Sequence, residues 1–169
     1  LAFKKKYFLI IESIKDLDLK KIKKRNKFII IYRNRGKREE IFNLISFRKK
    51  CKIKNILFYV ANDLNLAVKL HSDGIYLSSF NKSFKSLNLK RIKFNIIGGA
   101  HDTKEIHQKI SQGCKYILLS RLFTVQYKKK MNFLGINKFN YFTKRFQNLV
   151  PLGGINILNL NKTKSINSN

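Results

Sequence analysis

The sequence is poor in cysteine, proline and long apolar runs. Two isolated cysteines in 169 residues, Cys51 and Cys114, exclude a disulfide framework or a cysteine-based metal site, so we expect reduced thiols in a cytoplasmic protein. The apolar run Tyr7–Ile11 is too short for a signal-peptide core or a membrane span, and no membrane partner is expected. The chain is nevertheless long enough to bury the core of one domain.

Acidic residues are scarce as well: 9 Asp and Glu stand against 37 Lys and Arg, which gives a formal net charge of +28. Such a charge commonly indicates nucleic acid or an anionic membrane as the partner. Here the basic residues are spread along a chain that is also rich in Ile, Asn and Phe, which indicates compositional drift rather than a binding patch. No helix-turn-helix, zinc-finger or RNP pattern is present, so we expect no specific nucleic-acid partner.

The clearest local pattern is a strand–helix–strand unit in the second half of the chain. Asn95–Ile97 is an apolar strand that Gly98 and Gly99 are expected to end, and Asp102 with Glu105 predicts a capping box at the start of a helix. A right-handed crossover of this kind places functional groups at the carboxyl ends of its two parallel strands.

The helix of this unit has one expected inner face, formed by Ile106 and Ile110. Gly113 is a natural stop before the second strand, Tyr116–Leu119. The polar residues expected to point away from the core are Lys104, Gln108 and Lys109.

The same alternation of strand and helix runs through the whole chain. The predicted strands are Tyr7–Glu12, Phe28–Tyr32, Asn55–Ala61, Gly74–Leu77, Asn95–Ile97, Tyr116–Leu119 and Leu149–Leu152. The predicted helical stretches are a weak one in Ser13–Asn26, Lys37–Cys51 with Glu39 and Glu40 in its first turn, a short helix after Asn62-Asp63, Lys138–Arg145, and one beginning near Ile157, Leu158 and Leu160. Ser78–Lys93 and Thr124–Gly135 are expected to be mainly loop.

Seven strands that alternate with helices predict either an open doubly wound sheet or a closed (β/α)8 barrel. No glycine-rich dinucleotide fingerprint follows the first strand, which favours the barrel as one domain over residues 1–169. About seven strand–helix repeats are present, so this α/β TIM barrel is expected to be incomplete at its C-terminus. Because the chain begins with Leu1 and ends in a polar string, we expect a piece of a longer protein.

Polar groups and glycines follow the predicted strands, where a barrel builds its active site. They are Arg33, Arg35, Asn62, Asp63, Ser78 to Asn81, Gly99 to Asp102, Arg121, Lys128 and Gly153 to Asn156. Arginine and lysine suit phosphate oxygens, and a glycine pair leaves backbone N–H groups free for an anion. Asp63 is one carboxylate among many cations and suits Mg²⁺, although Asn62 and Asp63 can equally be helix caps.

Six pieces of sequence, taken in order, resemble the thiamine phosphate synthase and thiazole tautomerase family of TIM barrels. They are YFLII with IYRNR (31–35), AND (61–63), DGIYL (73–77), GGAHDTKE (98–105), GCKYILLSRLF (113–123) followed by Lys128, and PLGGIN (151–156). The resemblance covers nearly the whole chain.

The resemblance implies a transferase reaction on small phosphorylated substrates. Hydroxymethylpyrimidine diphosphate would condense with thiazole phosphate to give thiamine phosphate and diphosphate. The residues that match the family's diphosphate and Mg²⁺ positions are Arg33, Arg35, Asn62, Asp63 and Lys128, with Arg33 and Lys128 in catalytic roles and Gly153 and Gly154 as further substrate-binding positions.

Several positions depart from the family pattern. Ile31 stands where the family has glutamine, Asn81 where it has the second metal aspartate, and Gly99 where it has serine. The two threonines before the lysine fall at Val125 and Tyr127, and Gly-Pro has become Ser120-Arg121. These departures affect the positions for ring recognition, for the metal charge and for contacts to the thiazole phosphate. The alternative function is therefore that of a thiazole tautomerase-like protein or a non-catalytic phosphate-binding paralogue. His101 matches a family histidine, with helix capping as the alternative role.

Overall fold

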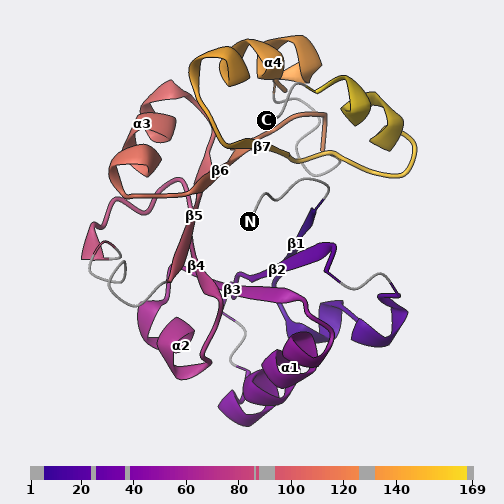
Figure 1. The fold of residues 1–169 in the computed structure, drawn as a ribbon, viewed down its shortest axis with the longest axis vertical. Coiled ribbons are helices and arrows are strands. Elements are labelled where there is room, and N and C mark those ends of the chain that lie inside the picture. Colours follow the sequence, from indigo (N-terminus) through magenta and orange to yellow (C-terminus); the bar gives the residue numbers. More distant parts are fainter. Residues whose placement is uncertain are drawn as a thin grey trace. The chain divides into compact units, whose positions relative to one another are not determined.

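A computed structural model describes residues 6–23, 26–36, 39–85, 87, 94–125 and 132–166. The described chain contains seven β-strands interleaved with α-helices and short 3₁₀ helices (Figure 1). It divides into two compact units, which we call unit 1 (residues 1–77 and 88–95) and unit 2 (residues 78–87 and 96–169). Each unit is described by itself below.

Unit 1 is a parallel sheet whose strands follow chain order. The strands are β1 (Tyr7–Ile11), β2 (Phe28–Tyr32), β3 (Leu57–Ala61) and β4 (Gly74–Leu77). The helices are α1 (Ile41–Ile53) and α2 (Leu64–Lys69), which lie on the same side of these strands in Figure 1. Two 3₁₀ turns, η1 (Ile14–Asp16) and η2 (Leu19–Lys21), replace the weak helix that the sequence predicts before β2.

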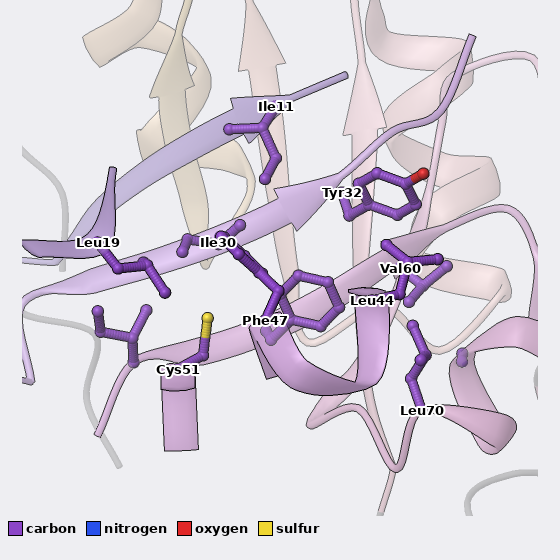
Figure 2. Packing of buried hydrophobic residues seen from close by; sticks show 12 residues of the cluster. Ile11, Leu19, Ile30, Tyr32, Leu44, Phe47, Cys51, Val60 and Leu70 are labelled. Atoms are coloured by element: carbon purple, nitrogen blue, oxygen red, sulfur yellow. The ribbon is translucent and has the colours of Figure 1, made fainter. Parts of the chain in front are cut away.

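The core of unit 1 lies between its strands and its helices, and Figure 2 shows it from close by. Ile30 and Tyr32 of β2 pack with Phe58 of β3 against Leu44 and Phe47 of α1. Ile29 and Ile31, which alternate with these residues on β2, are also fully buried. Burial of both faces explains why the strand is a continuous apolar run, as a parallel sheet requires.

Unit 2 contains the parallel strands β5 (Asn95–Ala100), β6 (Tyr116–Ser120) and β7 (Leu149–Leu152), of which Asn95 itself falls in unit 1. Its helices are α3 (Thr103–Ser111), α4 (Gly135–Arg145) and the 3₁₀ helix η5 (Leu160–Ser165). Ile106 of α3 and Phe139 of α4 are fully buried in one apolar cluster with Leu119 of β6. The helix predicted near Ile157, Leu158 and Leu160 is present as η5, but it begins only at Leu160, and Ile157 and Leu158 precede it in a turn and are almost fully exposed.

Two predicted element boundaries are also wrong. Helix α1 begins at Ile41, and the Glu39 carboxylate lies outside it, where its Oε1 accepts hydrogen bonds from Ser13 Oγ (2.6 Å) and Ile14 N (2.9 Å). Strand β5 runs on through Gly98 and Gly99 instead of ending there. Gly98 is required inside the strand because a Cβ at that position would lie 2.8 Å from Cγ of Lys109 and 2.9 Å from Sγ of Cys114.

Lys109 of α3 is fully buried, which corrects the prediction that it points away from the core. Its Nζ donates hydrogen bonds to Asn81 O (2.7 Å) and Gln112 Oε1 (2.8 Å), and these acceptors replace water around the ammonium group. Ile110, which the sequence predicts on the inner face, is half-exposed instead. Gly113 has φ +74° after the helix, as predicted for a glycine C-terminal stop.

Candidate functional site

In unit 1 the predicted residues stand at the carboxyl ends of β2 and β3. Arg33 follows β2, where its backbone N–H donates to Ile11 O (2.8 Å), and its side chain is half-buried. Asn62 follows β3 with φ +60°, and its N–H donates to Tyr76 O (2.8 Å). Asp63 comes next and is exposed. The structure therefore brings a guanidinium group, an amide and a carboxylate to the ends of neighbouring strands.

Arg35 is occupied by a different partner. Its Nε lies 3.1 Å from Oε1 of Glu12, and the two side chains are 62% and 45% exposed. An ion pair that is this exposed contributes only about 0–1 kcal/mol, so it holds Arg35 weakly.

Asp63 has the helix-capping role that the sequence left open. Its Oδ1 accepts the backbone N–H of Leu66 at 2.9 Å and caps α2. This hydrogen bond uses one carboxylate oxygen and leaves the side chain at the surface. Capping and ion binding are compatible here, because a carboxylate has lone pairs for several partners.

Asp63 also lines a cavity of about 470 Å³ within unit 1. The cavity is lined by apolar and polar residues from the end of β2, from α1 and α2, and from the loops that precede these helices: Tyr32, Asn34, Glu39, Ile41, Leu44, Asp63, Asn65, Leu66 and Lys69. Arg33, Arg35 and Asn62 are not among its lining residues, so the structure does not bring them into this cavity with Asp63.

Two buried polar atoms face this part of unit 1 without a hydrogen-bond partner among the described residues: Tyr32 Oη and Glu39 Oε2. Burial, and after it the nearby Glu39 carboxylate, raises the pKa of the Tyr32 phenol well above its usual range. The sequence predicts Tyr32 as part of a buried strand and Glu39 as part of the first turn of a helix, so it predicts neither as a site residue. Glu39 gave one usable signal: it is one of only 9 acidic residues.

In unit 2 the predicted glycine pair forms a turn directly after β7, with φ +94° at Gly153 and +70° at Gly154. A Cβ at Gly154 would lie 2.5 Å from the carbonyl oxygen of Phe123, so only glycine fits there. A Cβ at Gly153 would lie 3.2 Å from Cγ and 3.3 Å from Cβ of Arg121, so the base of this side chain lies against the turn. Arg121 follows β6, the strand that pairs with β7.

The other family positions have structural explanations where they are described. Asn81 Oδ1 accepts the N–H of Ser83 (2.9 Å) in a local turn, so this side chain serves the loop. His101 Nδ1 lies 3.0 Å from Oε2 of Glu105, which also accepts the His101 backbone N–H, so His101 belongs to the start of α3. Ile31, Gly99 and Val125 are buried. Lys128 and Tyr127 lie outside the described residues.

Neither the cysteines nor the histidines form a metal centre in the described ranges. Cys51 and Cys114 are free thiols, and burial raises the pKa of each to about 12, which keeps them protonated at neutral pH. The described residues contain no group of three or more His, Cys, Asp or Glu side chains placed to hold a metal ion. None of the helices described is long and apolar enough to cross a membrane.

The sequence profile described as thiamine monophosphate synthase matches residues 14–167. The chain belongs to this family. The thiamine-phosphate synthase of Prochlorococcus marinus subsp. pastoris is 30% identical over 132 residues, which are 76% of this chain and 37% of that protein. A second thiamine-phosphate synthase, from another Prochlorococcus marinus strain, is 30% identical over 119 residues, or 69% of this chain and 34% of that protein. The chain thus spans about a third of the length of these relatives.

The solved structures support the fold class. The thiamine phosphate pyrophosphorylase from Pyrococcus furiosus superposes with a TM-score of 0.66 at 16% identity and covers 83% of this chain and 69% of that chain. At this identity the likeness concerns the fold alone. It confirms the prediction of an α/β chain of the (β/α)8 TIM-barrel class with seven strands, and the family predicted from the six motifs is confirmed by the profile.

Proposed function

We propose that this thiamine monophosphate synthase family member is a transferase that joins hydroxymethylpyrimidine diphosphate to thiazole phosphate, giving thiamine phosphate and diphosphate. The observation that carries the proposal is the family match across residues 14–167, which includes the ends of β2, β3, β6 and β7. The relatives named thiamine-phosphate synthase support it. Phosphorylated small molecules are its proposed partners, and a cytoplasmic location stays a prediction.

In the proposed reaction the thiazole nitrogen donates its lone pair to the methylene carbon of the pyrimidine. A C–N bond forms, the C–O bond to the diphosphate breaks, and the bonding electrons leave with the diphosphate. The main task of the protein is then to stabilise the negative charge that develops on the leaving group. Arg33 supplies forked donors for this purpose and Asn62 an amide N–H. Arg35, Lys128, Gly153 and Gly154 complete the proposed set of phosphate-binding residues.

Mg²⁺ is the proposed cofactor, with Asp63 as its ligand. The residues fit the ion, because Mg²⁺ commonly binds through one or two carboxylates plus substrate phosphates, and the exposed Asp63 carboxylate spends only Oδ1 on the cap of α2. Glu39, whose Oε1 accepts hydrogen bonds from Ser13 Oγ and Ile14 N, is a second carboxylate residue that lines the same pocket as Asp63. When bound, Mg²⁺ would neutralise charge on the diphosphate.

A second candidate function is favoured by the positions at which this chain departs from the family pattern. Asn81 is engaged in a loop turn and carries no charge, and Ile31 is a buried apolar residue at the position of the family's glutamine. These changes suit a thiazole tautomerase-like protein, or a paralogue that binds phosphate without catalysing the condensation. The two functions differ in product formation, whereas both require phosphate binding.

The deciding experiment supplies the full chain with both substrates and Mg²⁺ and measures thiamine phosphate. We expect product, and we expect Arg33→Ala to lower kcat/KM by about 10²–10³-fold, as for the loss of one donor to a developing anion. Asp63→Ala should abolish the Mg²⁺ dependence of diphosphate binding. Arg145→Ala is the matched control, because this exposed arginine stacks on Tyr141 with its Cζ 4.9 Å from the ring centre.

The outcomes separate the two candidates. Diphosphate binding without any product would leave the paralogue as the function. Unchanged metal dependence in Asp63→Ala would remove Asp63 as the Mg²⁺ ligand. Because Asp63 also caps α2, Asp63→Asn is the companion variant: it retains an N-cap side chain and loses the charge, so a loss shared by both variants belongs to the ion rather than to the helix.

A further inference from the structure

We propose that Lys109 and Gln112 are positioning residues, which hold the loop after β4 in the shape that binds the diphosphate end of the donor substrate. This loop comprises residues 78–83, and we call it the β4 loop. The loop and both side chains belong to unit 2. The hydrogen bonds between them stand by themselves, whereas the role in diphosphate binding rests on the proposed function.

The first observation is a pair of polar side chains buried at the end of α3. Lys109 lies in the last turn of the helix and Gln112 is its C-terminal cap, and both are 0% exposed. Lys109 Nζ donates a hydrogen bond to Gln112 Oε1 at 2.8 Å, so the two side chains form one group. Burial of an amine and an amide is unfavourable unless their polar atoms are hydrogen-bonded, so their further partners explain why the fold tolerates them.

Those further partners are backbone carbonyls of the β4 loop. Lys109 Nζ donates to Asn81 O (2.7 Å), and Gln112 Nε2 donates to Asn81 O (3.0 Å) and to Ser83 O (2.8 Å). The two N–H groups of the Gln112 amide are both used in this way. Three hydrogen bonds therefore join α3 to the backbone of the loop, and they fix the direction in which the Asn81 side chain leaves it.

The side chains of the β4 loop contribute less to its attachment. Phe80 is its only aromatic residue and is 67% exposed. Two local hydrogen bonds shape the turn: Asn81 N donates to Ser78 O (3.0 Å), and Ser83 N donates to Asn81 Oδ1 (2.9 Å). Local bonds of this kind set the shape of a turn, whereas the bonds from α3 tie the turn to the fold.

The β4 loop lies where a barrel of this class builds its site, after the carboxyl end of a strand. It carries Asn81 at the position where the family has its second metal aspartate. An amide has no charge with which to draw the loop and a bound Mg²⁺ together, so the shape of this loop comes from the protein. A loop that is already held in place loses less conformational entropy when the ligand binds.

The test measures binding of inorganic diphosphate to the full chain in the presence of Mg²⁺ by calorimetry. The main variant is Gln112→Glu, which keeps the size of the side chain and an oxygen acceptor for Lys109 Nζ. It replaces the N–H donors with an oxygen atom that faces the carbonyls of Asn81 and Ser83. Gln108→Glu is the matched control, because it makes the same chemical change at a half-buried side chain of the same helix.

We expect Gln112→Glu to weaken diphosphate binding about tenfold, because two hydrogen bonds to the loop are lost. The amide of Ser83 should exchange with solvent faster by about the same factor, while the amides of β6 keep their protection. Gln108→Glu should match the unmodified chain in both measurements. An equal loss of protection in β6 would show a general loss of stability and would overturn the positioning role.

A second pair of variants tests Lys109 in the same way. Lys109→Met removes the hydrogen bond to Asn81 O and retains a long apolar side chain, so it should weaken diphosphate binding and loosen the loop in the same direction. Lys104→Met is its control, because Lys104 is exposed on the same helix. Faster exchange of the Ser83 amide together with undiminished diphosphate binding would overturn the proposal, since the loop would then move without consequence for the ligand.

The outcome is separable from the proposed reaction. If no thiamine phosphate forms but diphosphate binding depends on Gln112, the positioning role stands and the condensation falls. If product forms and Gln112→Glu leaves both kcat and the KM for the pyrimidine diphosphate unchanged, the reaction stands and the positioning role falls. In an active enzyme we expect Gln112→Glu to lower kcat/KM by about 10–10²-fold, as for a misplaced binding group.

Discussion

Lys109 shows how a single side chain can contradict a sequence pattern for a clear physical reason. It is one of 37 basic residues, nearly all of which would be expected in solvent, yet it is fully buried between Gly98, Cys114 and the loop that contains Asn81. Two oxygen acceptors within hydrogen-bonding distance make this possible. Burial still penalises the charged form and lowers the pKa of Lys109, which the nearby Cys114 and Glu105 only partly oppose.

This environment predicts a pH dependence of stability. A lysine whose pKa is lower in the folded state than in the unfolded state carries its burial penalty in full below the folded pKa. The unfolded state binds more protons in the window between that value and the unfolded 10.5, so stability rises with pH there by up to about 1.4 kcal/mol per pH unit. We therefore expect the folded protein to gain stability relative to Lys109→Met as the pH rises through this window.

The measurement is urea unfolding of both proteins at a series of pH values, with the difference between them plotted against pH. Lys104→Met is the control, because Lys104 is exposed on the same helix and its difference from the unmodified chain should stay flat. All three proteins carry Cys114→Ala as their background, because burial raises the pKa of the Cys114 thiol, Lys109 lowers it, and this coupling would otherwise enter the Lys109→Met difference. A difference for Lys109→Met that is flat or that falls with pH would contradict the assignment.

At the residue scale the sequence predicted positions better than roles. Arg33, Asn62, Asp63 and the glycine pair at 153 and 154 all follow strands, as expected, because the ends of apolar runs are visible in the sequence. The unpartnered atoms of Tyr32, Glu39 and Arg121 were not predictable, since a missing partner depends on what the rest of the fold brings nearby. The burial of Lys109 could not be predicted from the sequence for the same reason.

At the scale of elements, apolar runs predicted the bounds of the strands closely, whereas capping residues predicted the bounds of the helices less well. Strands β2, β4 and β7 match their predicted ranges, and α3 begins after Asp102 and stops before Gly113 as expected. Helix α1 starts later because the Glu39 carboxylate binds Ser13 and the backbone of Ile14, contacts far away in the sequence. Strand β5 continues through Gly98 because tertiary packing, and not a turn, requires that glycine.

The turn after β7 allows a prediction that separates backbone strain from steric overlap. Gly154 and Gly135 both have φ +70°. A Cβ at Gly154 would lie 2.5 Å from the Phe123 carbonyl oxygen, whereas at Gly135 its nearest neighbour would be Phe133 Cε2 at 4.0 Å. Both alanine variants pay about 1–2 kcal/mol for the left-handed conformation, and Gly154→Ala should cost about 1–3 kcal/mol more for the overlap.

Urea unfolding of the two variants at one pH checks this prediction, since the two substitutions are chemically identical. Equal losses of stability would show that the turn at Gly154 can shift away from Phe123. In that case the turn that we propose for anion binding would be less rigid than its contacts indicate.

At the scale of the whole molecule, the sequence predicts one domain over residues 1–169, while contacts divide the chain into two compact units. Cooperative unfolding of the two units is a measurable property. Arg48 and Asp73 in unit 1 offer a probe: Nη2 and Oδ1 lie 2.9 Å apart, Asp73 Oδ2 accepts the N–H of Phe58 (2.7 Å), and the side chains are only 11% and 26% exposed. Asp73→Ala would leave a largely buried guanidinium group without its carboxylate.

We expect Asp73→Ala to destabilise the protein by about 2–3 kcal/mol, less than a fully buried pair because Asp73 is partly solvated. Glu12→Ala, which breaks the exposed pair with Arg35, should cost about 0–1 kcal/mol and serves as the control.

Amide hydrogen exchange then measures the protection of backbone amides in each unit separately. If the chain is one cooperative domain, Asp73→Ala lowers the protection of amides in β3 and in β6 by the same free energy, because all of them exchange through the same global unfolding. Loss of protection in β3 with β6 unchanged would instead make the two units separate domains, each stabilised by its own core.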